Sequence, residues 1–408
     1  MLFIVLIYRL GNAVTVPFVD TVMLREQFAA LNNTILGMMN AMSGSAMERA
    51  SIFALSIQPY INASIIIQLL TVAIPALERL QKEGGEEGKK KLEKITRYST
   101  IAIAILQGYG YYVLISNYGV LDPTATGPWP PIAIVATFVA GSALLMWMGE
   151  QITEFGIGNG ISVILFVSIV SRFPVQVVNM ATKVLADLST WWIYVLMLLG
   201  ALAIVVLIVI VTNAERRIPV QYSKRVVGRK MYGGQSTRLP MKVNMSGVLP
   251  VIFAQSIASI PSTVVAFVPR WEDSWVMRNF SPTSIPYAII YFLLIVFFSY
   301  FYSTVQFNPI EISNNLRKNG GFIPGFRAGK PTSEFIQKVL TKITLFGALY
   351  LAIIAITPIL IARFSTTAQE SGISLGGTSV IIVVSVALET IKQLESQLLM
   401  RHYKGFLE

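Results

Sequence analysis

The sequence predicts an all-α polytopic membrane protein, and three observations support this fold class. Hydrophobic residues make up 54% of the 408 residues, more than the roughly 45–50% that is typical of soluble domains. Charged residues make up only 13%, about half of the usual share of about 25%. These charges fall in segments that separate long stretches without any Asp, Glu, Lys or Arg. Unbroken apolar runs of about 20 residues are typical of membrane-spanning helices, whereas barrel strands alternate apolar and polar residues.

Nine uncharged stretches are long enough to cross a bilayer, because about 17–20 helical residues suffice. In chain order they are Ala50–Leu77, Tyr98–Leu121, Pro123–Gly149, Phe155–Ser171, Leu188–Ala214, Val243–Pro269, Asn279–Ile310, Ile343–Ala362 and Ser371–Leu388. A tenth stretch, Met1–Leu10, is apolar but short, so we expect the chain to begin inside its first span. No charged leader and cleavage site precede it, so it is not interpreted as a signal peptide. The expectation is ten transmembrane helices.

Basic residues gather in three connecting segments, which indicates the orientation in the membrane. Arg79–Arg97, Arg216–Lys242 and Arg317–Lys342 carry 21 of the 32 Lys and Arg residues. Cytosolic loops of membrane proteins are enriched in Lys and Arg. Both termini are therefore expected in the cytosol, and the net charge of +11 mainly reflects topology.

Two of the cytosolic segments, about 213–244 and 308–338, are longer than a connection requires. The first mixes basic, aromatic and β-branched residues and is expected to form a projecting hairpin. The second contains the turn pairs Gly320-Gly321 and Pro324-Gly325 and should also protrude. Loops longer than about 12–15 residues tend to be functional or disordered. We expect a large acidic or phosphate-rich partner there, with the alternative that these loops only follow the topology rule.

Enzymatic and cofactor chemistry finds no support among the residues. The chain has no Cys and a single His, His402, so thiolate and imidazole metal sites are not expected. A phosphate loop around Lys330 fails because Pro324 and Pro331 stand where Gly and Ser or Thr are needed. Neither a metal nor a cofactor is therefore expected, and a membrane-embedded enzyme is disfavoured because no nucleophile with a base is found.

An ion-coupled solute transporter is the alternative function. Such a protein usually places ionisable groups or a broken helix near the middle of the membrane. The carboxylates here avoid the centres of the long spans: Glu150 and Glu154 lie at the end of one span and Glu389 lies late in the last. The transporter interpretation is therefore the weaker one.

The second span combines aliphatic and polar residues in an unusual way. Ile57, Ile61 and Ile65 recur every fourth residue, and Gln68 falls on the same face of the helix. Pro59 interrupts the helical hydrogen bonding near its start. This face is consistent with ordinary helix packing or with a hydrophobic constriction that gates by dewetting.

The segment just before this span, Asn40–Phe53, is too short and too polar to cross the membrane. Gly44 breaks it, and Glu48 and Arg49 lie in its middle. We expect a short re-entrant or surface helix. Irregular backbone at membrane depth is tolerated only where protein or a water-filled cavity encloses it, and a pore would meet this condition.

Several of these segments together resemble one known family. They are Met42–Leu70 (MSGSAMERASIFALSIQPYINASIIIQLL), Trp147–Ser162 (WMGEQITEFGIGNGIS), Gln235–Pro250 (QSTRLPMKVNMSGVLP), Asn308–Gly329 and Gly376–Val383 (GGTSVIIV). In order and spacing they closely resemble the SecY family, the pore-forming subunits of bacterial protein translocases. The resemblance covers essentially the whole chain. The visible departure is the family's basic amphipathic segment before span one, which this sequence lacks.

The resemblance implies two five-helix halves, 1–179 and 180–408, that form a pseudo-symmetric clamshell around a central pore. It implies a protein-conducting channel that passes unfolded secretory polypeptides across the bacterial inner membrane and releases transmembrane segments sideways into lipid. The implied pore ring is Ile57, Ile61, Leu165, Ile252 and Ile382, where Leu165 stands in place of a frequent isoleucine. The implied plug is a helix over about 43–53, with Ser43, Gly44, Met47, Glu48 and Arg49.

The resemblance also implies a lateral gate and a set of partners. Gln68, Gln107 and Gln255 match a polar cluster at the gate, where they would hold it shut until a signal peptide displaces them. Residues that match positions contacted by the ribosome or by the motor ATPase SecA are Lys224, Arg225, Arg229, Lys230 and Arg327. The small subunits SecE and SecG, nascent chains and membrane lipids are the other expected partners.

Overall fold

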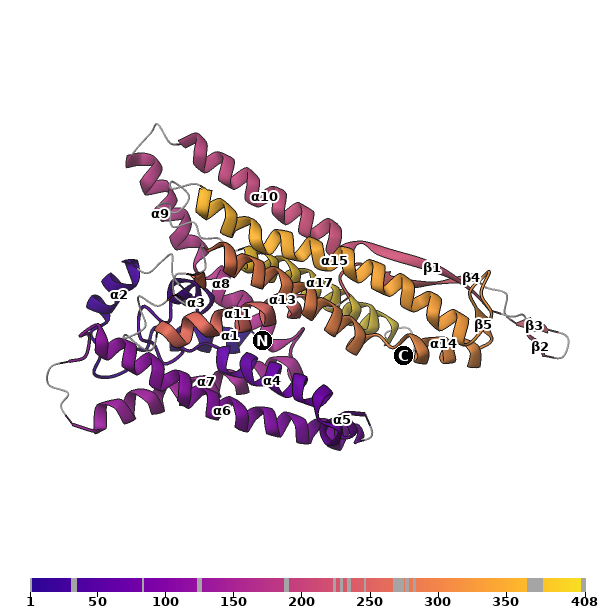
Figure 1. Ribbon diagram of the computed structural model, residues 1–408, viewed down its shortest axis with the longest axis horizontal. Helices are drawn as coiled ribbons and strands as arrows, with labels where there is room; N and C mark the ends of the chain where they lie inside the picture. The colour runs from indigo at the N-terminus through magenta and orange to yellow at the C-terminus, as the bar shows by residue number, and fades with distance from the viewer. Residues whose placement is uncertain are drawn as a thin grey trace.

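The structure is a computed structural model that describes most of the chain. The described residues are 2–30, 35–82, 84–122, 127–186, 191–222, 225–227, 230–232, 236–245, 247–266, 275, 279–281, 284–364 and 377–404. They form an elongated bundle of helices from which one β-hairpin extends (Figure 1). The helical fold class is the one that the apolar stretches predicted.

Helices account for most of the described residues. Their bounds are α1 Leu2–Gly11, α2 Thr21–Ala30, α3 Ile35–Met42, α4 Gln58–Ala73, α5 Pro75–Lys82, α6 Gly85–Asn117, α7 Trp129–Phe155, α8 Gly160–Val170, α9 Phe173–Ala186, α10 Trp191–Asn213, α11 Leu249–Ala266, α13 Ile285–Gln306, α14 Pro309–Lys318, α15 Lys330–Phe364 and α17 Gly377–Lys404. The strands are β1 Glu215–Tyr222, β2 Arg225–Val227, β3 Lys230–Tyr232, β4 Ser236–Lys242 and β5 Gly321–Phe322.

Fewer helices reach full spanning length than the ten spans that the sequence predicts. Within the described residues, six helices are long and apolar enough to cross a membrane. A seventh span results if α4 and α5, which meet at a bend of 104°, are taken together. Helices α1 and α11 are apolar but shorter. The structure therefore shows a polytopic helical membrane protein, with a span count of six or seven by this measure.

The expected span Ala50–Leu77 begins later than predicted, because α4 starts only at Gln58. Pro59 lies in the first turn of α4, so it does not interrupt the helix interior. A proline in the first turn removes no helical hydrogen bond, since those N–H groups have no intrahelical partner. The helix instead ends at Ala73, and the extended residue Ile74 separates it from Pro75.

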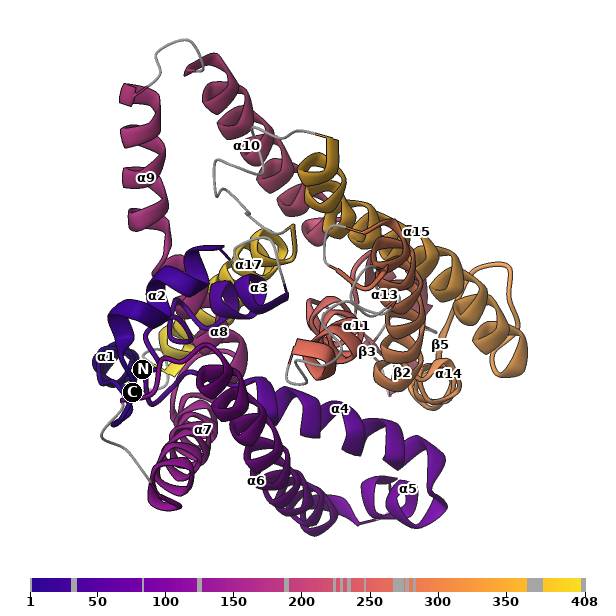
Figure 2. The ribbon, with the colours of Figure 1, turned by 60° about the vertical axis from the view of Figure 1, so that its left-hand side comes forward.

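The helices pack in two groups that meet along a seam (Figure 2). Helices α4, α6, α7 and α8 follow one another in contact, as do α11, α13, α15 and α17. The groups touch where α3 and α4 meet α11 and where α8 meets α17. The expected boundary between halves, 179/180, falls inside α9. The chain passes from one group to the other through α9 and α10 (Figure 2), and α10 packs against α17.

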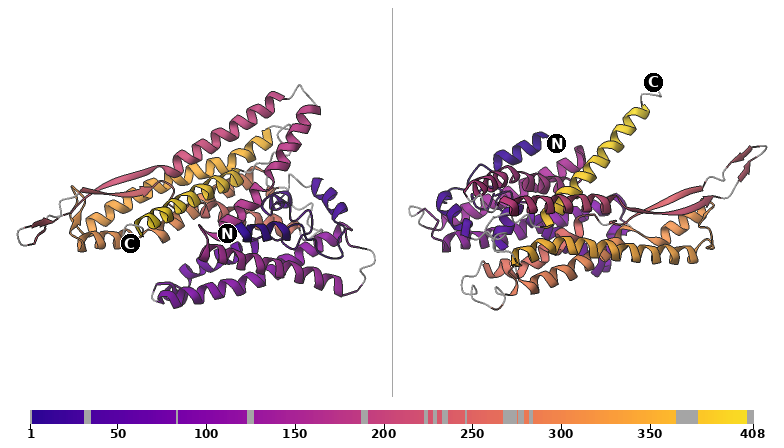
Figure 3. Two further views of the ribbon diagram at one scale, coloured as in Figure 1. Left: turned by 180° about the vertical axis from the view of Figure 1, so that it is seen from behind. Right: turned by 90° about the horizontal axis from the view of Figure 1, so that it is seen from above.

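The predicted hairpin after α10 is confirmed. Strands β1 and β4 pair antiparallel, from Glu215 opposite Lys242 to Gln221 opposite Ser236. Strands β2 and β3 form a separate pair at the tip (Figure 3). Strand β5 pairs with the end of β1, so the two long connecting segments share one three-stranded sheet. A separate buried cluster that includes Ile218, Met241 and Ile336 packs this sheet against α15.

Candidate functional site

The five predicted ring residues lie together at the centre of the bundle. Ile57 and Ile61 come from the start of α4, Leu165 from α8, Ile252 from α11 and Ile382 from α17. All five belong to one buried hydrophobic cluster, and none is more than 3% exposed. Ring residues from α4, α8, α11 and α17, which belong to both groups of helices, are thus part of the same buried aliphatic cluster.

Local sequence explains how α8, the helix that carries Leu165, is positioned. The side chain of Asn159 caps α8, because its Oδ1 accepts hydrogen bonds from the N–H groups of Ile161 and Ser162 at 3.0 and 3.3 Å. The cap follows the glycine-rich segment between α7 and α8. At Gly160 a Cβ would lie only 1.9 Å from the backbone oxygen of Gly149, so only glycine permits α8 to approach α7 this closely.

The segment predicted as a short plug helix has a different structure. Residues 43–57 form consecutive turns, and the helix in this region is α3, which ends at Met42. The physical reason is the backbone: Gly44, Ser45, Ala50 and Ser56 all have positive φ, between 43° and 70°. L-residues with positive φ cannot continue a right-handed helix. The plug helix of the sequence analysis is therefore wrong as secondary structure.

Tertiary hydrogen bonds hold this segment in place. The N–H of Val16 donates to the carbonyl of Ala50 at 2.9 Å, and that of Ile52 donates to the carbonyl of Val14 at 3.0 Å. The hydroxyl of Tyr111 donates to the carbonyl of Met47 at 2.5 Å. These bonds satisfy backbone groups that a helix would have paired internally.

The predicted plug residues differ in their surroundings. Ser43 and Met47 are buried, at 2% exposure each. Glu48 is half-buried and pairs with Asn40, whose Nδ2 donates to Glu48 Oε2 at 2.7 Å while its Oδ1 accepts from the Glu48 N–H at 3.1 Å. Arg49 is exposed. Sequence reasoning missed Asn40, although it lies at the start of the segment.

The three glutamines predicted to form one polar cluster are divided between two places along the seam. Gln107 and Gln255 line one cavity of about 210 Å³ between α3, α4, α6 and α11, together with Gln58 and Asn62. Gln68 instead accepts a hydrogen bond at 2.5 Å from the hydroxyl of Tyr302. Of the three predicted glutamines, Gln107 and Gln255 therefore share one cavity, whereas Gln68 makes a separate contact with Tyr302.

Two residues that sequence reasoning missed complete these contacts. Tyr302 on α13 bonds to Gln68 on α4, and this bond crosses the seam. The thioether of Met42 accepts from Gln255 Nε2 at 3.2 Å and from Gln58 Nε2 at 3.7 Å. Met42 thus joins the segment before the turns to both sides of the seam. Neither residue carries a distinctive local pattern, so no sequence signal could have found them.

The predicted cytosolic contact residues lie on the hairpin and on the second loop. Arg225 is in β2 and Lys230 in β3, whereas Lys224 and Arg229 lie outside the described residues. Arg327 is exposed in the loop between β5 and α15. Its carbonyl accepts from the hydroxyl of Thr332 at 2.8 Å, which fixes the backbone of the loop and leaves the guanidinium free for solvent or a partner.

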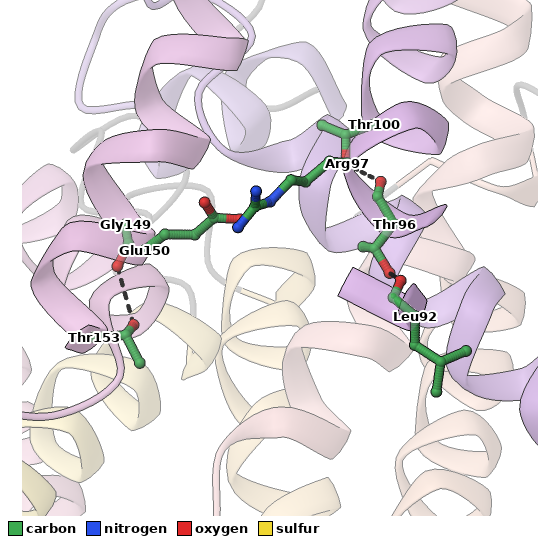
Figure 4. A network of polar contacts seen from close by, with 7 residues as sticks. All are labelled: Leu92, Thr96, Arg97, Thr100, Gly149, Glu150 and Thr153. Atoms are coloured by element: carbon green, nitrogen blue, oxygen red, sulfur yellow. Dashed lines mark hydrogen bonds and ion pairs between the residues drawn. The ribbon is translucent and has the colours of Figure 1, made fainter. Parts of the chain in front are cut away.

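One ion pair links α6 and α7, two helices of the first group (Figure 4). Arg97 Nε on α6 lies 2.8 Å from Glu150 Oε1 on α7, and the two side chains are 49% and 28% exposed. Exposed pairs of this kind contribute about 0–1 kcal/mol. Among residues with a described position, no three His, Asp or Glu side chains are grouped closely enough to hold a metal ion.

Comparisons with known proteins agree with this architecture. The family model described as SecY matches residues 51–391. "Protein translocase subunit SecY" from Streptomyces coelicolor is 45% identical, over 99% of this chain and 94% of the relative.

Two solved structures share the fold. One is described as "The structure of a protein conducting channel" and has a TM-score of 0.66 at 17% identity, over 97% of this chain and 90% of that one. The other, "Sec61 in the Canine ribosome-channel complex from the endoplasmic reticulum", has a TM-score of 0.62 at 16% identity, over the same shares. Because both sequence identities are low, the two structures support the fold alone. From the family model and the bacterial relative, this chain belongs to the SecY family.

Proposed function

We propose that this chain is the pore subunit of a bacterial protein translocase, a multi-pass membrane protein through which unfolded polypeptides cross the membrane. Membership of the SecY family supports this role. The single observation that carries it is that five aliphatic residues from four helices belong to one buried cluster: Ile57, Ile61, Leu165, Ile252 and Ile382. A channel subunit of this kind performs no bond chemistry, so its energy comes from partners.

An aliphatic constriction suits this task for a physical reason. Bulky apolar side chains exclude water and ions when nothing occupies the pore. They also close around an extended polypeptide of any sequence, because dispersion contacts do not depend on specific hydrogen-bond geometry. Ile57, Ile61, Leu165, Ile252 and Ile382 would therefore seal the resting channel and form a gasket around the moving chain.

We assign the turns over residues 43–53 as the resting plug. Met47 and Ser43 are buried against the same bundle that holds the ring, and the bonds from Tyr111 and Val16 hold the segment there. Apart from the packing of Met47, Ala50 and Phe53, single hydrogen bonds hold the segment to its neighbours. A translocating chain that replaces them would displace the segment without unfolding a helix.

The seam between α4 and α13 would be the lateral gate. The Tyr302–Gln68 hydrogen bond joins its two sides, and Gln107 and Gln255 line the cavity between α4, α6 and α11. Interhelical hydrogen bonds in membranes average about 0.6 kcal/mol, which keeps a gate closed and lets an apolar signal helix open it. The remaining expectations, ten spans and two five-helix halves, belong to this proposal.

The hairpin end of the molecule would face the cytosol. The basic cytosolic segments on α5 and α6, the β1–β4 hairpin and the end of α17 lie toward one end, and α2 and α9 toward the other (Figure 1). Lys and Arg favour the cytosolic side, and cytosolic termini remain part of this proposal. The ribosome, the motor ATPase SecA and the small subunits SecE and SecG are the proposed partners. The solved canine relative is a ribosome complex by its own description.

The test is translocation in a defined system. The chain is reconstituted with its small subunits in vesicles, motor ATPase and ATP are added, and protease protection of a signal-bearing preprotein is measured. Protection should require ATP and should fall in Arg327→Glu. Lys338→Glu, an exposed charge reversal eleven positions along the same segment, is the matched control. If the wild-type complex gives no protection with active partners, the channel assignment fails and solute-flux assays address the transporter alternative.

A further inference from the structure

The link between the hairpin and α11 places a polar residue at the base of the projecting sheet. The N–H of Val243 donates to the carbonyl of Ala214 at 2.9 Å, which extends the β1–β4 pairing by one bond. Asn244 follows and is 7% exposed. A few residues later the chain enters α11, which carries Ile252 and Gln255. Any movement of the hairpin therefore reaches α11 through this link.

The link is packed tightly on α15. A Cβ on Gly347 would lie 2.6 Å from the carbonyl oxygen of Val243, so the absence of a side chain at Gly347 lets the backbone of the link rest directly on the helix. The link thus lies between α13 and α15 with little freedom to shift.

A small polar cavity opens at this contact. Its volume is about 10 Å³, and its lining includes Asn244, Ser299, Ser303, Thr344 and Gly347. Ser303 Oγ and Thr344 Oγ1 lie 2.8 Å apart and bond to each other. Ser299 Oγ and Asn244 Nδ2 have no hydrogen-bond partner among the described residues, although Ser299 is only 2% exposed.

The volume and the lining specify a ligand. Buried polar atoms in proteins almost always have a partner, and here two unpaired ones line one cavity. A cavity needs about 10–15 Å³ of this kind of volume to hold a water molecule, which usually makes about three hydrogen bonds. Asn244 Nδ2 offers a donor, Ser299 Oγ offers a donor and acceptors, and the Ser303–Thr344 pair offers a further acceptor. A larger ligand does not fit.

We propose that this cavity is a binding site for a single water molecule, which joins Asn244 of the link to Ser299 on α13. The water accepts from Asn244 Nδ2 and bonds to Ser299 Oγ and to the Ser303–Thr344 pair. It completes a polar connection between the base of the hairpin and two membrane helices.

The site has a consequence for gating that rests on the proposed function. Tyr302 lies between Ser299 and Ser303 in α13 and donates to Gln68 across the seam. A hairpin bonded to α13 through the water transmits a load from a cytosolic partner to the turn of helix that holds the gate.

The first experiment measures the site without any translocation. In the purified complex with its small subunits, thermal unfolding is compared for Ser299→Ala, Asn244→Ala and the double variant. Ser385→Ala on α17 is the matched control, because Ser385 is also buried with an unpaired hydroxyl and lies outside this cavity. We expect each cavity variant to lower Tm by about 2 °C, the double variant to lower it by less than the sum, and Ser385→Ala to leave it unchanged or raised.

A high-resolution map of the complex gives a direct answer. We expect a density peak within hydrogen-bond distance of both Asn244 Nδ2 and Ser299 Oγ. The proposal is overturned if other buried waters are resolved and this cavity is empty, or if Ser299→Ala behaves as Ser385→Ala does.

A distance measurement tests the mechanical role. The chain has no cysteine, so Thr237→Cys on β4 and Val305→Cys on α13 can be spin-labelled without background. We expect one narrow distance distribution that broadens in Ser299→Ala and not in Ser385→Ala. An unchanged distribution in Ser299→Ala would overturn the link between hairpin and α13. These readouts need no transport activity, so they fail separately from the channel assignment.

Discussion

The hydrogen bond between Tyr302 and Gln68 makes a quantitative prediction about the gate. Tyr302→Phe removes the hydroxyl and keeps the ring that packs against Phe253 and Phe298. The hydroxyl donates to Gln68 Oε1 at 2.5 Å across the α4–α13 seam. If this bond forms only in the closed gate, its loss shifts the equilibrium toward opening.

The magnitude follows from measured interhelical hydrogen bonds, about 0.6 kcal/mol on average and about 1.7 kcal/mol at most. Because a factor of ten corresponds to about 1.4 kcal/mol, opening should become roughly 3-fold to 16-fold easier. The assay is translocation of a preprotein with a weakened signal sequence, compared with the same preprotein carrying its full signal. Translocation of the preprotein with the weakened signal should increase by this factor, whereas translocation of the preprotein with its full signal should change little.

A control variant and a double-mutant cycle test whether the effect of Tyr302→Phe comes from its hydrogen bond to Gln68. Tyr300→Phe removes a hydroxyl from the same helix, where it donates to the carbonyl of Thr341 at 3.4 Å, away from the seam. In addition, Gln68→Met combined with Tyr302→Phe should add nothing beyond either change alone, since both remove the same bond. Equal effects of the two tyrosine variants, or full additivity in the double variant, would refute the reasoning.

Three further predictions concern the ring and the helices that present it. Ile61→Ser should raise the ion conductance of the resting channel in planar bilayers, because a hydroxyl wets the constriction. The control Ile66→Ser changes a residue that is 47% exposed on the same helix and should not raise the conductance. Equal conductance in the two variants would contradict the ring assignment. Gly160→Ala should lower Tm, because its Cβ would lie 1.9 Å from the backbone oxygen of Gly149. In the control Gly200→Ala the new Cβ meets no atom within 4 Å. This control should leave the stability unchanged or raise it by up to about 1 kcal/mol. Asn159→Ala should cost about 1 kcal/mol through loss of the cap, measured by denaturant unfolding of the complex; an unchanged midpoint would show that the α8 cap is dispensable.

Much of the fold was readable from hydropathy and charge. Apolar stretches without charges predicted the helices α6, α7, α10, α13 and α15, since a bilayer requires such runs. The β-branched and basic run after α10 predicted the hairpin. Each of these features depends on local composition, so local reasoning was sufficient.

The segment before α4 shows where local reasoning fails. Residues 43–57 contain good helix formers such as Met47 and Glu48, yet bonds from Val16 and Tyr111 hold them as turns. Those donors lie far away in the sequence. The plug helix was wrong because tertiary hydrogen bonding overrode helix propensity.

The sequence by itself determined that this is a multi-pass helical membrane protein with basic connecting loops, because hydropathy, charge and periodicity are properties of the chain. Only the tertiary structure decided which side chains meet. It separated Gln68 from Gln107 and Gln255, brought Tyr302 to Gln68, and left Asn244 and Ser299 facing one cavity. The physical reason is that helices in a membrane are all apolar outside, so their rotation and partners depend on packing across the bundle, which no local pattern encodes.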